Sequence, residues 1–202
     1  MKRYGKLWEK IIDLENIRHA YKKARRAKGW QRTIRQFEKN EEENLVQIKR
    51  FLQEKSFTTA PYRIKKIYVP KEREIFVLPF CPDRIVQHAL VNIVGPIWDR
   101  MMIYDSYACR PGKGQHGASL AVMRAIKTNK HCFQGDIKKF YPSVRHDILF
   151  EIIQRKIKDE DALWLIRDII YSIDGGRNVP IGNYTSQWFG NLYLNELDTF
   201  VK

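Results

Sequence analysis

The chain has 202 residues, of which 44% are hydrophobic and 12% aromatic, and its formal net charge is +14. A chain of this length and apolar content is expected to be globular, and a protein this basic favours nucleic acid as its partner, although a generally basic protein is the alternative. No stretch approaches the roughly 18 apolar residues of a membrane span, no apolar signal core follows the N-terminus and no CxxC pair occurs, so we expect a cytoplasmic protein without a membrane partner, zinc site or disulfide framework.

Two amphipathic helical regions are predicted within the first 60 residues. In the first, apolar residues recur at helical spacing (Leu7, Ile11, Leu14, Ile17 and Tyr21). The second runs from about Arg32 to Leu52, with its apolar side facing inward. A cluster of cations between them is predicted to contact nucleic-acid phosphates, with a solvated charged face as the alternative: Lys22, Lys23, Arg25 and Arg26.

A change in residue composition after Tyr62 predicts a β-hairpin. Residues 63–69 and 73–78 are β-branched and aromatic, and Pro70 lies between them. The basic tip, with Lys71 and Arg73, suits the charge of a triphosphate, but a solvated edge hairpin is the plainer reading. A helix over about 82–97 is expected next.

A basic, glycine-bearing connection spans residues 110–114, before a helix predicted over 117–127. Its backbone amides, together with Arg110 and Lys113, suit the backbone of a nucleic acid. An ordinary connecting loop is an equal alternative.

The stretch from His131 to Asp136 predicts a strand that ends in a carboxylate. Two-metal nucleotidyl transfer needs carboxylates at a strand end, where they reach Mg²⁺. A bulky ring beside the sugar is needed to reject a 2′-hydroxyl, and Tyr141 is placed to supply it. Taken alone, Asp136 is more often a turn cap and Tyr141 a core residue.

The C-terminal third predicts two helices within residues 146–171, a turn at 174–176 and a last helix from about Ser186 to Phe200. The loop before that helix contains Gly182, which permits close approach of backbone to a ligand, and Thr185 or Ser186 is the expected N-cap. A loop followed by a helix N-terminus suits a base pair or a phosphate, although an ordinary capped helix is the commoner case.

These segments, in this order, resemble the fingers and palm of reverse transcriptases, over about residues 60–202. The resemblance rests on Tyr68-Val69-Pro70-Lys71 to Gln87, on 107–116, on Asp136 to Tyr141 and on Ile181 to Gln187. It implies an α+β fold: a basic helical N-terminal extension at 1–60, fingers at 61–130 and a partial palm at 131–202, with the thumb absent.

The motif at 181–187 narrows the resemblance. Most reverse transcriptases begin it with Gln and end it with Ser-Pro, whereas this chain has Ile181 and Gln187 at those places. Ile-Gly-Asn-Tyr-Thr-Ser-Gln resembles the enzymes of diversity-generating retroelements, which make error-prone cDNA from a template RNA with a small basic accessory protein. The alternative within the class is a group II intron-type reverse transcriptase or maturase.

The resemblance assigns roles by position. Asp136 and the backbone carbonyl of Ile137 would bind catalytic Mg²⁺ (Mn²⁺ in its place), and Tyr141 would be the steric gate. The partners implied are template RNA, the cDNA primer and product, and dNTPs. The residues expected to bind the nucleotide are Lys71, Arg73, Ile137, Ile181, Gly182 and Gln187, and Arg110 and Lys113 join the basic cluster in binding nucleic acid.

One departure from the family is large. Its second catalytic palm motif carries two adjacent Asp residues, and this chain has no Asp-Asp pair before it ends at Lys202. We therefore expect a fragment that binds nucleic acid but does not polymerise. The rival from another class is a non-catalytic RNA-binding scaffold that has kept the fingers.

Overall fold

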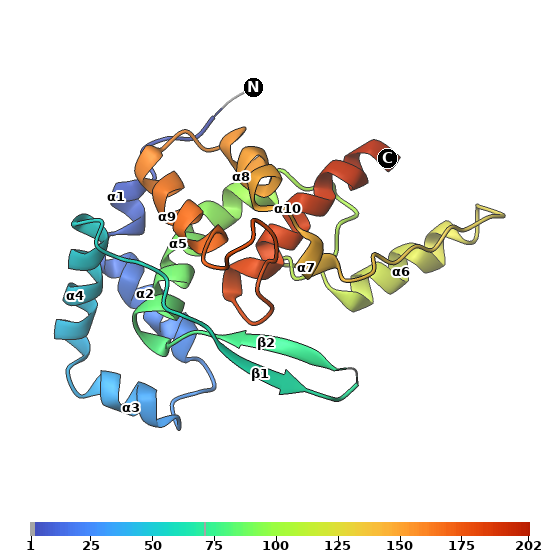
Figure 1. The fold of residues 1–202 in the computed structure, drawn as a ribbon. Coiled ribbons are helices and arrows are strands. Elements are labelled where there is room, and N and C mark those ends of the chain that lie inside the picture. The colour runs from blue at the N-terminus through green and yellow to red at the C-terminus, as the bar shows by residue number, and fades with distance from the viewer. Residues whose placement is uncertain (1–2, 71) are drawn as a thin grey trace.

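The structure is a computed structural model that describes residues 3–70 and 72–202. It has a helical body from which a two-stranded hairpin and a long arm project (Figure 1). The body contains α1 (Trp8–Ile11), α2 (Leu14–Arg25), α3 (Arg32–Glu38), α4 (Glu41–Gln53), α5 (Ile85–Asp99), α8 (His146–Gln154), α9 (Glu160–Ile170) and most of α10 (Tyr184–Val201). The hairpin is β1 (Arg63–Ile67) with β2 (Arg73–Val77), the turn η1 (Phe80–Arg84) precedes α5, and the remaining helices are α6 (Gln115–Ala125) and the short α7 (Phe140–Ser143).

The two N-terminal helical regions form as predicted, but each is divided. The first breaks between α1 and α2, and the second breaks between α3 and α4 at Lys39 and Asn40. The five residues predicted to face inward in the second region are all buried: Ile34, Phe37, Leu45, Ile48 and Leu52. The acidic run at 41–43 occupies the first turn of α4, where the helix dipole favours negative charge.

One core joins residues from both ends of the chain. Helix α5 buries ten of its residues and packs against α2 and α10. Trp98 of α5 is fully buried and lies edge to face with Phe189 of α10, at 5.8 Å between ring centroids. Since burial of such side chains supplies most of the favourable free energy of folding, this contact holds α10 against α5.

A contact near the N-terminus ties α1 to the start of α9. Tyr4 pairs with Ile157 in an isolated parallel bridge. The Asp159 carboxylate accepts the backbone N–H of Leu7 at 2.6 Å and of Trp8 at 3.2 Å, and its other oxygen caps α9 by accepting from Ala162. One side chain therefore accepts hydrogen bonds from backbone N–H groups at the N-termini of two helices.

The predicted hairpin is confirmed, and β1–β2 is the only sheet among the described residues. Its strands are antiparallel, with Arg63 opposite Val77 and Ile67 opposite Arg73. The strand predicted over His131–Asp136 is wrong. That stretch is fully exposed, and none of the described residues pairs with it, so its backbone has no ladder to join. The expected partial palm sheet is therefore absent from the described part of the chain.

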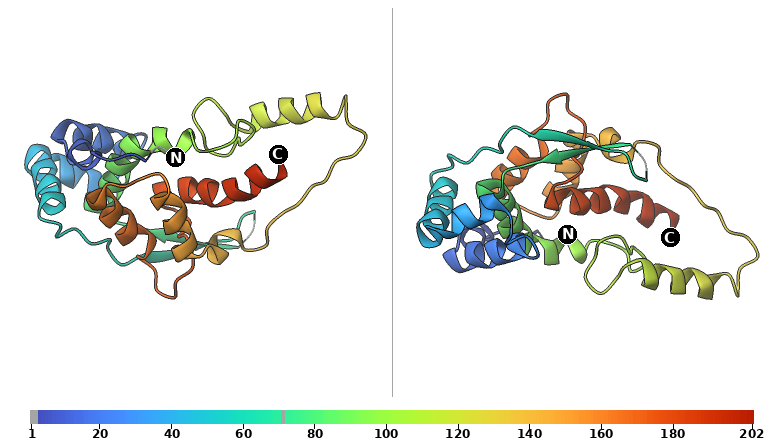
Figure 2. Two further views of the ribbon diagram at one scale, coloured as in Figure 1. Left: turned by 90° about the horizontal axis from the view of Figure 1, so that it is seen from above. Right: turned by 90° about the horizontal axis from the view of Figure 1, so that it is seen from below.

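The arm consists of α6 and the extended segment 128–139, which returns toward α7 (Figure 2). No residue of α6 is buried. The spacing of Phe189, Tyr193, Leu197 and Phe200 predicts one apolar stripe along the last helix. Phe189 is 2% exposed, whereas Phe200, beyond the body, is 87% exposed, so the stripe is buried only in its first half. No helix in the described ranges has the length and apolar character needed to cross a bilayer.

Candidate nucleotide-binding cavity

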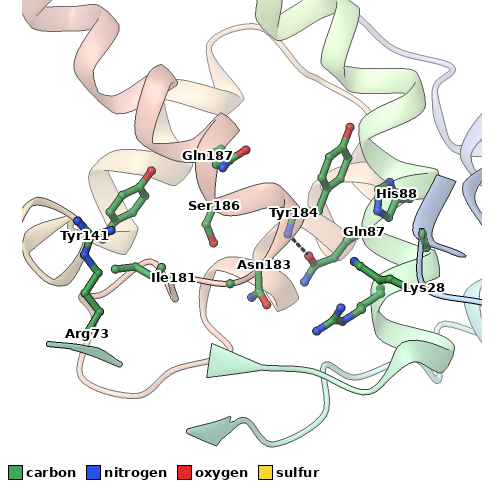
Figure 3. A pocket seen from close by; sticks show the side chains of 13 residues that line it. Lys28, Arg73, Gln87, His88, Tyr141, Ile181, Asn183, Tyr184, Ser186 and Gln187 are labelled. Carbon is green, nitrogen blue, oxygen red and sulfur yellow. Dashed lines mark hydrogen bonds between the residues drawn. The ribbon is translucent and has the colours of Figure 1, made fainter. Parts of the chain in front are cut away.

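A cavity of about 470 Å³ opens where the hairpin, the end of α2, the start of α5, α7 and the loop before α10 meet (Figure 3). Its walls come from five segments that are far apart in the sequence. They are lined by Ala24, Lys28, Arg73, Arg84, Gln87, His88, Tyr141, Ile181, Gly182, Asn183, Tyr184, Ser186 and Gln187.

Five of the residues that the sequence singled out lie together in this cavity: Arg73, Tyr141, Ile181, Gly182 and Gln187. In Figure 3, Arg73, Tyr141 and Ile181 lie at one end of it. The structure thus brings the hairpin tip, the predicted steric gate and the 181–187 loop around one space. Their roles in nucleotide binding stay predictions.

Gly182 is required by the way the hairpin sits on the 181–187 loop. Its φ is +121°, and a Cβ built there would lie 2.6 Å from the carbonyl oxygen of Phe76. Next to it, the Phe76 N–H donates to the Ile181 carbonyl at 2.7 Å. The absence of a side chain therefore lets two backbones touch and fixes the distance between β2 and the loop.

The N-terminus of α10 is held by contacts from outside the helix. The expected cap at Thr185 or Ser186 is wrong, because the helix begins at Tyr184 and the Ser186 hydroxyl donates to the Pro180 carbonyl instead, at 2.7 Å. The Tyr184 N–H donates to Oε1 of Gln87, a buried residue of α5, at 3.1 Å. A side chain from a different helix thus does the work of a cap.

The cavity is electropositive. Lys28, Arg73 and Arg84 line it, and no acidic residue does. Burial, and then the nearby charge of Arg84, lower the pKa of Lys28. Burial is also the main reason that the pKa of His88 falls to about 4, with nearby cations contributing, so its imidazole is neutral at pH 7. A site with several cations and no counter-charge favours an anionic ligand.

The residues predicted to hold the metal lie elsewhere. Asp136 and Ile137 are exposed on the extended segment and do not line the cavity, and Lys71 lies outside the described residues. In the described ranges, no three His, Cys, Asp or Glu side chains are grouped so that they could hold a metal ion. A catalytic Mg²⁺ or Mn²⁺ does not fit the donor set that the described residues offer, since hard divalent cations need several oxygen ligands.

Arg110 is held by contacts within the chain, and its contact with nucleic acid stays a prediction. Its side chain is 7% exposed and forms an ion pair with Asp99 at 2.8 Å. The same guanidinium donates to the carbonyls of Ile103, Ser106 and Asp99, so four of its five N–H groups have partners within the chain. Lys113 donates to the Tyr104 carbonyl at 2.8 Å and lies 3.4 Å above that ring.

The residues of the basic cluster at the end of α2 differ in their contacts. Arg25 forms an ion pair with Glu38, whereas Lys22 and Arg26 are exposed. Lys23 donates to Asn92 at 2.7 Å and lines a second cavity of about 310 Å³ along α5. Tyr184 lines both cavities, so the second adjoins the first.

Four lining residues were missed by sequence reasoning: Lys28, Arg84, Gln87 and His88. Gln87 and His88 interrupt an otherwise apolar run, Ile85-Val86-Gln87-His88-Ala89-Leu90. A polar pair inside a buried helix is a signal, because buried polar groups need partners. Lys28 and Arg84 carried no such signal, since only the folded chain brings them together.

Comparison with profiles of known protein families gives no match. Among curated proteins, the chain is similar to protein YkfC of Escherichia coli K12, with 27% identity over 157 residues, covering 70% of this chain and 41% of that protein. It is also similar to the group II intron-encoded protein LtrA of Lactococcus lactis subsp. cremoris (26% identity; 76% of this chain, 28% of LtrA) and to nuclear intron maturase 4 of Arabidopsis thaliana (22% identity; 63% and 17%). The chain thus spans less than half the length of these relatives, which include group II intron-encoded proteins and maturases.

Proposed function

We propose that this chain is the nucleotide- and nucleic-acid-binding part of a reverse transcriptase of the group II intron-like kind. One observation carries the proposal: Arg73, Tyr141, Ile181, Gly182 and Gln187, named from separate motifs, line one cationic cavity without an acidic residue. The similarity to group II intron-encoded proteins and maturases supports the same class of protein.

The reaction of that class is RNA-directed DNA synthesis, in which a primer 3′-hydroxyl attacks the α-phosphate of a dNTP. In the proposed roles, Arg73 holds the triphosphate, for which a guanidinium is well suited because it binds phosphate oxygens in pairs. Tyr141 is the steric gate beside the sugar. Ile181, Gly182 and Gln187 form the wall against the nascent base pair. Template RNA, the cDNA strand and dNTPs are the proposed ligands.

The 202-residue chain is proposed to bind nucleic acid without polymerising. A bound Mg²⁺ or Mn²⁺ would supply the charge neutralisation that phosphoryl transfer needs. In the full-length enzyme, Asp136 and the Ile137 carbonyl are the proposed metal ligands, to which further oxygen ligands must be added, because the described residues do not offer enough of them. Among the described residues, Asp136 lies outside the cavity, no carboxylate lines the cavity, and no three His, Cys, Asp or Glu side chains are grouped to hold a metal ion.

The test combines binding with primer extension. A DNA primer annealed to an RNA template should bind the purified chain with a steep dependence on salt, because each phosphate contact releases counterions. Lys22→Ala with Arg26→Ala should flatten that dependence. An affinity that does not change between low and moderate salt would show that the basic cluster does not contact the nucleic acid. Detectable primer extension would refute the proposed lack of polymerisation, whereas binding of RNA with no preference for a primer–template would favour the non-catalytic scaffold.

Within the class, a diversity-generating retroelement enzyme is the finer proposal, with a group II intron-type enzyme or maturase as the second candidate. The finer proposal rests on Ile181, which lines the cavity and offers no hydrogen bond where a Gln would offer two kinds. Fewer polar constraints reduce the difference between right and wrong transition states, so substitutions accumulate. Such an enzyme would work with a small basic accessory protein. In a full-length enzyme, unchanged misincorporation opposite adenine after Ile181→Gln would rule this reasoning out.

A further inference from the structure

The end of the cavity opposite Arg73 carries an arrangement that the proposed nucleotide site does not use. There, Tyr184 stacks on His88, with ring centroids 3.9 Å apart and planes inclined by 20° (Figure 3). Tyr184 remains 37% exposed although its backbone begins a buried helix. An exposed aromatic ring with a second ring behind it is a rigid surface on which a nucleobase can stack.

Gln87 holds the backbone that carries that ring. Its Oε1 accepts the Tyr184 N–H at 3.1 Å, and its side chain is 2% exposed. The Nε2 donor of the same amide has no hydrogen-bond partner among the described residues, and neither does Nδ1 of His88. Two unpartnered buried polar atoms beside one cavity are uncommon in a finished site, because each costs free energy until it meets a partner.

Cations flank the ring on both sides. Lys28 and Arg84 line the first cavity, where the charge of Arg84 adds to burial in lowering the pKa of Lys28, and neither forms an ion pair with an acid in the described ranges. Lys23 lines the second cavity, on the other side of Tyr184. The single acid there, Asp99, is already paired with Arg110. A phosphate on either side of the ring would relieve uncompensated positive charge.

We propose that Tyr184 is the stacking platform for one unpaired nucleotide of the template strand, with Lys28 and Arg84 holding its phosphate and Gln87 positioning the ring. This inference rests on the proposed function, since it places the template strand at the end of the cavity that the incoming nucleotide leaves free. An aromatic face between separated cations is the arrangement that binds single-stranded nucleic acid without reading its sequence.

The experiment compares two primer–template duplexes by fluorescence anisotropy: one blunt, and one with a single unpaired template nucleotide. The wild-type chain should bind the second more tightly. Tyr184→Leu should remove that advantage, a loss of about five- to hundredfold, whereas Tyr184→Phe, which keeps the ring, should retain it. Replacing the unpaired nucleotide by an abasic residue should weaken the wild type and leave Tyr184→Leu without further loss.

The cations are tested by the salt dependence of the same binding. Lys28→Ala should lower the slope of log affinity against log salt by about one. Lys39→Ala is the matched control, since Lys39 lines a separate groove beside α3, and it should leave the slope unchanged.

Four results would overturn the inference. The first is equal loss of affinity for blunt and extended duplexes in Tyr184→Leu, which would make the ring merely structural. The second is an extended-duplex advantage that survives in Tyr184→Leu, and the third is an unchanged salt slope in Lys28→Ala. The fourth is a dNTP that competes only with the extended duplex, which would assign the platform to the free nucleotide. Failure of the wild type to bind any duplex would instead refute the proposed function.

Discussion

Replacing Gly182 by Ala should separate the hairpin from the loop that precedes α10. The left-handed φ of +121° costs a residue with a Cβ about 1–2 kcal/mol. The new methyl group would meet the Phe76 carbonyl oxygen at 2.6 Å, so the strand must move and the Phe76–Ile181 hydrogen bond, now 2.7 Å, is stretched or lost. That bond contributes about 1 kcal/mol net. The expected fall in the free energy of unfolding is about 2–3 kcal/mol.

Urea titration of wild type and variant, followed by tryptophan fluorescence, measures this fall. Gly176→Ala is the matched control, because Gly176 also has a positive φ, +67°, but a Cβ there meets nothing within 4 Å. It should show the conformational cost alone, about 1–2 kcal/mol. Gly182→Ala should also weaken nucleic-acid binding, since Gly182 lines the cavity. If the two variants lose the same free energy, the close approach of backbone at Gly182 does not constrain the fold.

Three further outcomes are expected from equilibrium unfolding. Asp159→Ala should cost about 2–3 kcal/mol, because it removes a helix cap and leaves the Leu7 N–H without its acceptor; a loss below about 0.5 kcal/mol would contradict the role of this carboxylate. Burial raises the pKa of Asp83, so the folded chain holds a proton that the unfolded chain releases, and the free energy of unfolding should fall as the pH rises from about 4 through the raised pKa. Asp83→Asn should remove that fall, and parallel pH profiles of wild type and variant would refute this expectation. Phe189→Ala should cost about 3–5 kcal/mol, whereas Phe200→Ala, on the same helix but 87% exposed, should change stability by less than about 0.5 kcal/mol.

The helices were predictable because their signal is local. Apolar spacing identified the buried residues of α3, α4 and α5, which pack as expected. The breaks at Asp13 and Asn40 were not predicted, since no Pro or Gly marks either position. Boundaries of this kind depend on tertiary contacts that spacing does not report.

The strand over His131–Asp136 failed for a different reason. Its composition suits a strand, but a strand exists only when another segment pairs with its backbone, and none of the described residues does. Along α10 the apolar residues share one side as predicted, but periodicity does not show how far the body extends beneath that side, and Phe200 is exposed.

The cavity was half predictable. Its motif residues, such as Arg73 and Ile181, were recognised from sequence order, yet nothing in the sequence showed that they would share one space with Lys28 and Arg84. For Arg110, the sequence suggested a role without showing the contacts that the side chain makes within the chain. A basic residue in a glycine-bearing loop suggested a contact with nucleic acid, but the Asp99 carboxylate and three carbonyls accept four of the five N–H groups of its guanidinium.

The contact between Asp159 and the N-terminal helix has a consequence for folding during synthesis of the chain. The carboxylate that holds the Leu7 N–H lies 152 positions later in the sequence. At about 5–20 residues per second, a ribosome needs about 8–30 s to synthesise that interval. During this time α1, a helix of four residues, is too short to persist alone. The hydrogen bonds that hold the N-terminus of the first helix therefore form late in synthesis, after α2 and α5, against which the helix also packs, have been made.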